Sequence, residues 1–257
     1  MTHATFRLLR FLWIPAVLLT LWEYSSQRVD NLFFPPPSAI FVTALQVVSL
    51  EFINNHLLPT LGVFAGGFLI GSICGAIVGT LVGSSALAYE VLSPILVFLR
   101  SMPTAAKLPV LLGILGIGTQ SIYAAVALSV FFNVSVVTMI GVARVHKDTL
   151  EASALLSLNK LREMFVVRLP AATGEVLTGL QTAMQVALLV TVLAETLASG
   201  RGMGAFLIES QYLFRITEMW LVIILLGAIG VLANQLFLFV ERHLAPWYFQ
   251  TRARGFE

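Results

Sequence analysis

The segment that decides the fold is EASALLSLNKLREMFVVRLPAA, which runs from Glu151 to Ala172. It carries two acidic side chains, three basic ones and Asn159, yet long apolar runs flank it on both sides. Polar residues are expensive inside a bilayer, so a polar segment of this length indicates a loop in water between two membrane spans. The sequence therefore predicts a membrane protein with a structured loop over residues 143–172.

The composition of the whole chain agrees with a membrane protein. Of its 257 residues, 58% are hydrophobic and 11% are charged, whereas a soluble domain carries about 25% charged residues. Too few polar side chains remain to cover a soluble surface, which predicts an all-α, polytopic fold. The net charge of +2 is too small to indicate a nucleic-acid partner, and the single cysteine, Cys74, excludes an internal disulfide.

Six apolar segments approach the ~20 residues that a helix needs to cross a bilayer. The third is the least regular, because two basic residues and two prolines interrupt it. We expect one transmembrane domain over residues 1–257, with its core at 58–240 and an uncleaved first span. The expected spans are roughly 9–24, 58–83, 87–116, 119–142, 173–198 and 217–240.

The distribution of Lys and Arg predicts the orientation. With six spans both termini share one side, and that side holds ten Lys and Arg residues against three on the other, leaving out Arg100 and Lys107. Positive loops face the cytoplasm, so we expect both termini and the loop at 143–172 in the cytoplasm.

Glycines recur at every fourth position of the second span. Such a face lets another helix approach closely, either within the subunit, which we favour, or at a dimer seam. The residues of this face are Gly67, Gly71, Gly75, Gly79 and Gly83.

The outer connection after the first span contains FFPPPSAI, from Phe33 to Ile40. Its three prolines fix an extended turn, after which Ser38 is placed to cap a short helix over 39–50. A rigid loop without a helix is the alternative.

The loop at 143–172 carries start and stop signals for two short helices. Asp148 is placed to cap the first, with Glu151 at its third position, and Asn159 is a candidate left-handed stop. Pro170 suits the first turn of the helix that follows. An apolar ridge at helical spacing comprises Leu150, Ala154, Leu155 and Leu158. This ridge needs lipid headgroups, its own bundle or a groove of another protein to cover it.

The loop resembles the EAA loop of ABC importer permeases. Glu151-Ala152-Ser153, the small Ser157 and the closing Leu169-Pro170 stand at the family's spacing, although the family has Ala and Gly where this chain has Ser153 and Ser157. FFPPPSAI, LRSMPTAAKLPVLLGILGIG (99–118), the segment 192–204 and VERHLAPW (240–247) are similar to the nitrate, sulfonate and taurine branch of these permeases.

The resemblance implies an ATP-driven importer in the inner membrane of a bacterium, for a small solute such as a sulfonate, taurine or nitrate. The first loop helix would dock in a groove of a separate cytoplasmic ATPase. That ATPase would bind ATP and Mg, because this chain has no GxxxxGK[ST] phosphate loop. No cofactor is expected in this chain itself. An extracytoplasmic solute-binding protein would deliver the cargo, and a permease homodimer would supply one ridge to each of two ATPase subunits. The implied coupling residues are Glu151, Ala152, Ser153, Ser157, Leu158, Leu169 and Pro170.

Four polar residues within the spans are candidates for the pathway or its gate, because polar side chains at membrane depth face the bundle interior or a water-filled cavity. They are Asn133, Gln181, Gln185 and Glu195. Hydrogen bonding between helices is the alternative, and for Glu195 the resemblance favours a structural lock or gate. Arg100 either attracts an anionic substrate or, as we favour, extends toward the headgroups.

Three other classes of function compete with the importer. A membrane enzyme lacks support, since the chain has neither HExxH nor GxSxG and its histidines are scattered. An ion-coupled secondary transporter would need midplane carboxylates or inverted repeats, and only Glu195 is arguable. A scaffold subunit would explain the glycine face but not the apolar ridge. No metal site is expected.

Overall fold

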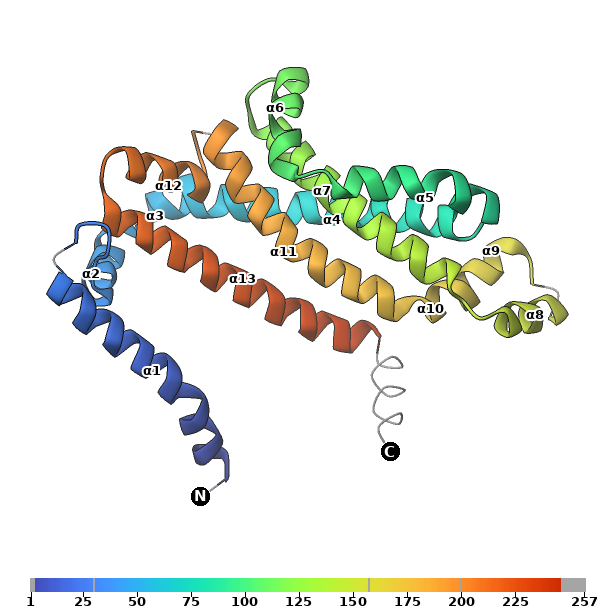
Figure 1. Cartoon of the computed structure of the whole chain (residues 1–257), viewed down its shortest axis with the longest axis horizontal. Helices are drawn as coiled ribbons and strands as arrows, with labels where there is room; N and C mark the ends of the chain where they lie inside the picture. The colour runs from blue at the N-terminus through green and yellow to red at the C-terminus, as the bar shows by residue number, and fades with distance from the viewer. Residues whose placement is uncertain (1–2, 30, 157, 199, 246–257) are drawn as a thin grey trace.

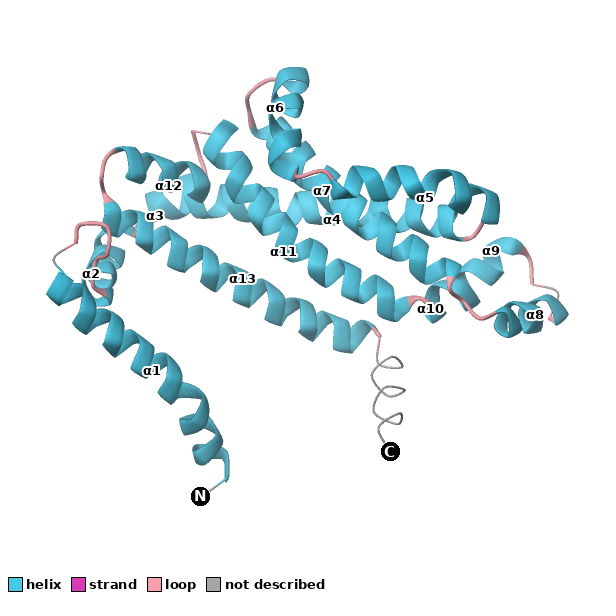
Figure 2. Cartoon of the chain, viewed as in Figure 1, coloured by secondary structure: helices cyan, strands magenta, loops and turns pink. Residues whose placement is uncertain are grey.

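The computed structural model describes residues 3–29, 31–156, 158–198 and 200–245, and within these ranges every regular element is a helix (Figures 1 and 2). Side chains are described over the same ranges, apart from those of residues 3–12 and a few single positions. The longer helices are α1 (His3–Val29), α2 (Pro37–Val47), α4 (Leu58–Gly83), α5 (Ala86–Ser101), α6 (Thr104–Leu115), α7 (Thr119–Ala143), α11 (Thr173–Ala198), α12 (Met203–Tyr212) and α13 (Ile216–Leu244). The shorter ones are α3 (Leu50–Phe52), η1 (Ile53–Leu57), α8 (Lys147–Leu155), α9 (Lys160–Glu163), η2 (Met164–Arg168) and α10 (Leu169–Ala171).

Four helices in the described part are long and apolar enough to cross a membrane. They are α7, α11, α13 and the longer helix Leu50–Gly83, which contains α4. Four of the six expected spans therefore coincide with helices to within a few residues, because uninterrupted apolar length alone defines a span.

The expected third span, 87–116, is not one straight helix. It consists of α5 and α6, which meet at an angle of 94°. Pro103 has no N–H to continue the helix, and its ring pushes Met102 into an extended conformation with φ −65° and ψ 128°. The described part thus has four segments that are long and apolar enough to cross a membrane, or five if this bent pair is one span.

The first helix, α1, contacts the rest of the chain near its C-terminal end, and its N-terminal end points away from the bundle (Figure 1). Its Trp22 ring lies 5.9 Å from that of Phe34 and 5.1 Å from that of Trp220, and Ser26 donates a hydrogen bond to the Phe34 carbonyl. Because the side chains of its first ten residues are outside the description, the span expected at 9–24 stays a prediction.

Ser38 has a different role from the one expected. The helix α2 begins at Pro37, before Ser38, whose N–H and hydroxyl donate to the Glu23 carboxylate at 3.0 and 2.7 Å. A carboxylate accepts more strongly than a neutral oxygen, so the serine ties α2 to α1 instead of capping its own helix.

The centre of the bundle is α7, which packs against α4 on one side and α11 on another. All five glycines of the recurring face lie against α7, and a Cβ atom at each of them would come within 3.0 Å of an α7 atom. The glycine face therefore brings two helices of the same subunit into close contact.

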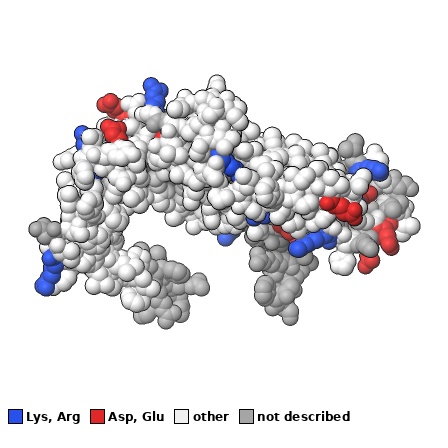
Figure 3. Space-filling model, turned by 45° about the horizontal axis from the view of Figure 1, so that its top comes forward, with Lys and Arg blue, Asp and Glu red and all other residues white. Residues whose placement is uncertain are grey.

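The connections gather at two ends of the bundle. At one end lie α2, α3 and α12, and at the other lie α8, α9 and α10 (Figure 1). Charged side chains are concentrated toward these ends, while uncharged surface covers most of the middle (Figure 3). This distribution is what an embedded bundle requires, since apolar faces meet lipid and charges meet water.

Candidate functional site

The polar loop folds into two short helical pieces that extend beyond the ends of α7 and α11 (Figure 1). The first is α8. The second is the run formed by α9, η2 and α10, over residues 160–171. Two helices were expected here, and two are present.

The start and stop signals of the loop act differently from their expected roles. The helix α8 begins at Lys147, one residue before Asp148, so Asp148 lies in the first turn rather than capping it. Asn159 does not adopt a left-handed conformation, since Phe214 is the only described non-glycine residue with positive φ. Its side-chain oxygen instead accepts from the Arg162 N–H at 2.8 Å and caps the second piece.

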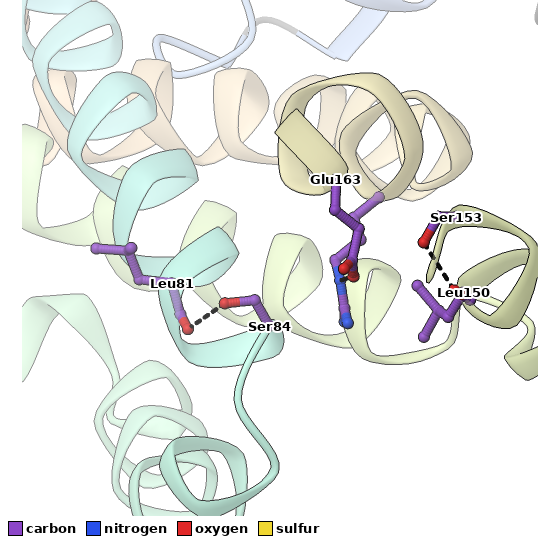
Figure 4. A network of polar contacts seen from close by, with 6 residues as sticks. Leu81, Ser84, Leu150, Ser153 and Glu163 are labelled. Carbon is purple, nitrogen blue, oxygen red and sulfur yellow. Dashed lines mark hydrogen bonds and ion pairs between the residues drawn. The ribbon is translucent and has the colours of Figure 1, made fainter. Parts of the chain in front are cut away.

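Short-range polar contacts hold the loop together (Figure 4). The Arg168 guanidinium lies 2.7 Å from the Glu163 carboxylate, and the buried Ser153 hydroxyl donates to the Leu150 carbonyl at 2.7 Å. A groove of about 320 Å³ separates the second piece from the α4–α5 turn, and its lining includes Ser84, Glu163 and Arg168. The second piece thus lies beside the end of the bundle.

Beside exposed charged residues such as Asp148, Glu151 and Arg162, the loop exposes four large apolar side chains. The side chains of Leu155, Leu156, Phe165 and Val166 are 87%, 73%, 64% and 60% exposed. Leu155 and Leu156 lie at the end of α8, whereas Phe165 lies on η2 and lines an apolar hollow of about 270 Å³ with Ile77 and Leu81 of α4. Large exposed apolar side chains mark a surface that lipid or another protein covers.

The ridge predicted from the sequence shares only Leu155 with this set, because Leu150 and Leu158 are half-buried and the Ala154 side chain lies outside the description. We call the four exposed residues the apolar ridge of the folded loop.

The predicted coupling residues fall around this ridge. Glu151, Ala152 and Pro170 are exposed, Leu158 and Leu169 are half-buried, and Ser153 is buried. Ser157 lies outside the described residues. The Glu151 carboxylate has no hydrogen bond or ion pair within the described part of the chain, so it is available to a partner.

The four candidate pathway residues do not converge on one point. Gln181 donates to the Asn234 side chain of α13 at 3.1 Å, and the exposed Gln185, one turn further on, lines a cavity of about 470 Å³ between α11 and α13. Asn133 faces α5 instead, where its side-chain oxygen accepts from Arg100 Nε at 3.1 Å. This bond holds the Nε end of the Arg100 side chain against α7, and its extension toward the headgroups stays a prediction.

Glu195 forms a buried lock between α11, α4 and the turn before α12. It is 1% exposed, and both of its carboxylate oxygens lie 2.9 Å from the Thr60 hydroxyl. The Gly204 N–H donates to the carboxylate at 2.9 Å, and the Met203 N–H donates to the Thr60 hydroxyl at 2.8 Å.

Glycine at position 202 makes this enclosure of Glu195 feasible. Gly202 has φ +102°, and a Cβ atom there would lie within 3.0 Å of the Glu195 carboxylate. Its carbonyl lies 3.1 Å from His56 Nδ1. Sequence reasoning missed Thr60 and His56, and the signal that could have indicated the lock is the closely spaced pair Gly202 and Gly204 shortly after a buried acid.

We expect Glu195→Ala to destabilise the protein by about 1–3 kcal/mol, because it leaves the Gly204 N–H and the Thr60 hydroxyl without their buried acceptor. The measurement is the thermal unfolding midpoint of the detergent-solubilised protein. Glu209→Ala, at an exposed acid of α12, is the matched control and should stay within about 0.5 kcal/mol of wild type. Equal midpoints for the two variants would contradict the lock.

The bundle, the bent helix pair and the projecting loop together are the architecture of a helical membrane protein. Residues 67–250 match the family described as the binding-protein-dependent transport system inner membrane component. The chain therefore belongs to this family, the permease subunits of ABC importers.

Curated relatives and solved structures agree with this membership. The chain is 30% identical to the taurine transport system permease protein TauC of Escherichia coli, covering 91% of this chain and 87% of the relative. It is 28% identical to the nitrate import permease protein NrtB of Synechocystis, covering 90% and 87%. The inward-facing MetNI methionine ABC transporter matches with a TM-score of 0.63 and 18% identity, covering 77% of this chain and 98% of the other, and so supports the fold.

Proposed function

We propose that this permease forms the translocation pathway for a small anion, such as a sulfonate, taurine or nitrate, which an extracytoplasmic solute-binding protein delivers. The names of the relatives, which include nitrate and taurine permeases, support the cargo class. The pathway candidates Asn133, Gln181, Gln185 and Glu195 belong to this proposal.

The energy source in this proposal is a separate cytoplasmic ATPase that docks on the loop. The single observation that carries the docking is the apolar ridge, whose Leu155 and Leu156 lie at the end of α8, the helix that projects beyond the bundle (Figure 1). ATP and Mg are bound by that ATPase, since this chain has no phosphate loop. In a homodimer, two ridges would occupy two ATPase grooves, and the loop and both termini would face the cytoplasm.

Motion at the ridge has a short mechanical route to the membrane. From Lys160 to Ala198 the chain is helical apart from a break near Ala172, and backbone bonds continue through this break, from the Ala172 N–H to Arg168 and from the Val176 N–H to Ala172. A displacement of the second loop piece would therefore move α11, which packs on α7 at the centre of the bundle. All 257 residues act as one transmembrane domain in this scheme.

Site-specific cross-linking tests the docking. A photoreactive amino acid at Leu155, which is 87% exposed, should capture in native membranes a protein with the GxxxxGK[ST] sequence of an ATPase, identified by mass spectrometry. The same amino acid at Leu45 of α2, which is 72% exposed at the other end of the bundle, is the control and should not capture it. The proposal would be abandoned if Leu155 captured no ATPase, or if Leu45 captured it equally.

A further inference from the structure

The bend between α5 and α6 brings together two basic side chains that the proposed coupling does not use. Arg100 lies in the last turn of α5 and Lys107 in α6, beyond the bend. The Lys107 ammonium reaches back across the bend and donates to the Leu99 carbonyl at 2.6 Å, so it lies beside the residue that precedes Arg100. It also lies 5.1 Å from the centre of the Phe132 ring. We call Arg100, Ser101, Thr104 and Lys107 the elbow.

The elbow lies level with the middle of an apolar helix that is long enough to cross a membrane. Arg100 Nε donates to Asn133, which is near the middle of α7 (Thr119–Ala143), one of the crossing helices. The same stretch of α7 supplies Ser129, whose hydroxyl lies 3.5 Å from that of Thr104. Polar side chains from both sides of the bend and from α7 therefore meet level with the middle of α7.

The two cations of the elbow have more N–H donors than hydrogen-bond acceptors. A guanidinium has five N–H donors and an ammonium has three, and within the described part of the chain the bonds to Asn133 and Leu99 are the ones that they make. The ion pairs of Glu163 with Arg168 and of Arg215 with Glu218 involve neither cation. Arg100 is exposed. Hydrocarbon cannot meet these donors, so the elbow requires water or an anion.

The start of α6 adds to the same field. No side chain caps this helix of 12 residues, which follows Pro103 directly, and the amide end of a helix favours negative charge. Two uncompensated cations and a helix amino end thus converge on one bend with no acidic side chain paired to them in the described residues.

We propose that the elbow is an anion-binding station of the pathway, which holds a small oxyanion through the Arg100 guanidinium and the Lys107 ammonium. This inference rests on the proposed function, because it assigns the point in the membrane where the negative group of the cargo binds. Planar N–H donors fit the oxygens of a nitrate, sulfonate or carboxylate. The Thr104 hydroxyl adds a neutral donor. Asn133 orients the Arg100 side chain by accepting the hydrogen bond from its Nε.

The test uses a cysteine reporter beside the cations in the ATPase–permease complex, reconstituted in nanodiscs. In a Cys74→Ser background, Ser101→Cys keeps both basic residues and replaces an exposed hydroxyl at the bend. We measure its reaction with a negatively and a positively charged methanethiosulfonate, each relative to a free thiol in solution. Phe98→Cys, at a 66% exposed apolar position of the same helix, is the matched control.

We expect the cysteine at 101 to react readily and to prefer the negative reagent several-fold. Nitrate should slow this reaction, but the bulkier gluconate should not. The cysteine at 98 should react slowly with both reagents. Adding Arg100→Gln or Lys107→Gln should abolish both the preference and the protection. A cysteine at 101 that is as unreactive as that at 98, or a preference unchanged by either glutamine, would overturn the anion site. Retained ATPase in each purified variant shows that the complex is folded, and the Leu155 cross-link tests the proposed function independently.

Discussion

Glu151→Lys is expected to release the ATPase from the purified permease and to abolish ATP-driven uptake, while the variant still inserts in the membrane. Glu151 is exposed and has no bond within the described residues, so its replacement should not disturb the fold. At an interface, however, a reversed charge leaves a partner group unpaired and desolvated, which costs about 2–5 kcal/mol. This cost corresponds to a loss of affinity of roughly 30-fold to several thousand-fold.

The measurement is the amount of ATPase that co-purifies with the permease, together with uptake by vesicles and the amount of folded permease. Thr149→Lys is the matched control, since residue 149 is exposed on the same short helix but lies about 200° around it from position 151. We expect Thr149→Lys to retain most of the ATPase. If Glu151→Lys kept both the ATPase and uptake at wild-type levels, the loop would have to dock through another surface.

The sequence predicted the spans well because their signal is local and long. An apolar run near 20 residues has few alternatives to a crossing helix, and α4, α7, α11 and α13 begin within one residue of their expected positions. In the sequence, the bend at Pro103 was visible only as an interruption of the third apolar segment by polar residues and prolines. Its angle of 94° depends on how α5 and α6 each pack against α7, and no local pattern encodes that packing.

The polar contacts were harder to predict because their partners are distant in the sequence. Ser38 bonds to Glu23, fifteen residues earlier, and Thr60 bonds to Glu195, 135 residues later. A side chain that a local sequence pattern assigns to a cap or to the pathway can also bond to a distant residue. The distant contact forms where it offers a stronger acceptor or lies in a drier environment. Gln181 is a further case, since its partner Asn234 lies on another helix.

Gly71→Leu should prevent most of the protein molecules from folding. A Cβ atom at residue 71 would come within 3.0 Å of the Ala127 carbonyl oxygen and of the Val130 side chain, both on α7. The carbonyl belongs to the helix backbone and cannot rotate away, so the two helices must separate along their length. Overpacking a core costs about 1–3 kcal/mol and occasionally more, and we expect this site at or above the upper end. The measurement is the yield of monodisperse protein and its unfolding midpoint.

Two further variants separate steric conflict from helix propensity at this position. Gly71→Ala should also destabilise the protein, although alanine favours a helix by about 1 kcal/mol over glycine, because its Cβ atom alone already meets the α7 backbone. Gly113→Leu, in α6, should be neutral or stabilising, since a Cβ atom there has no neighbour within 4 Å. If Gly71→Leu folded normally and instead abolished subunit association, the glycine face would have to pack against a second permease chain rather than α7.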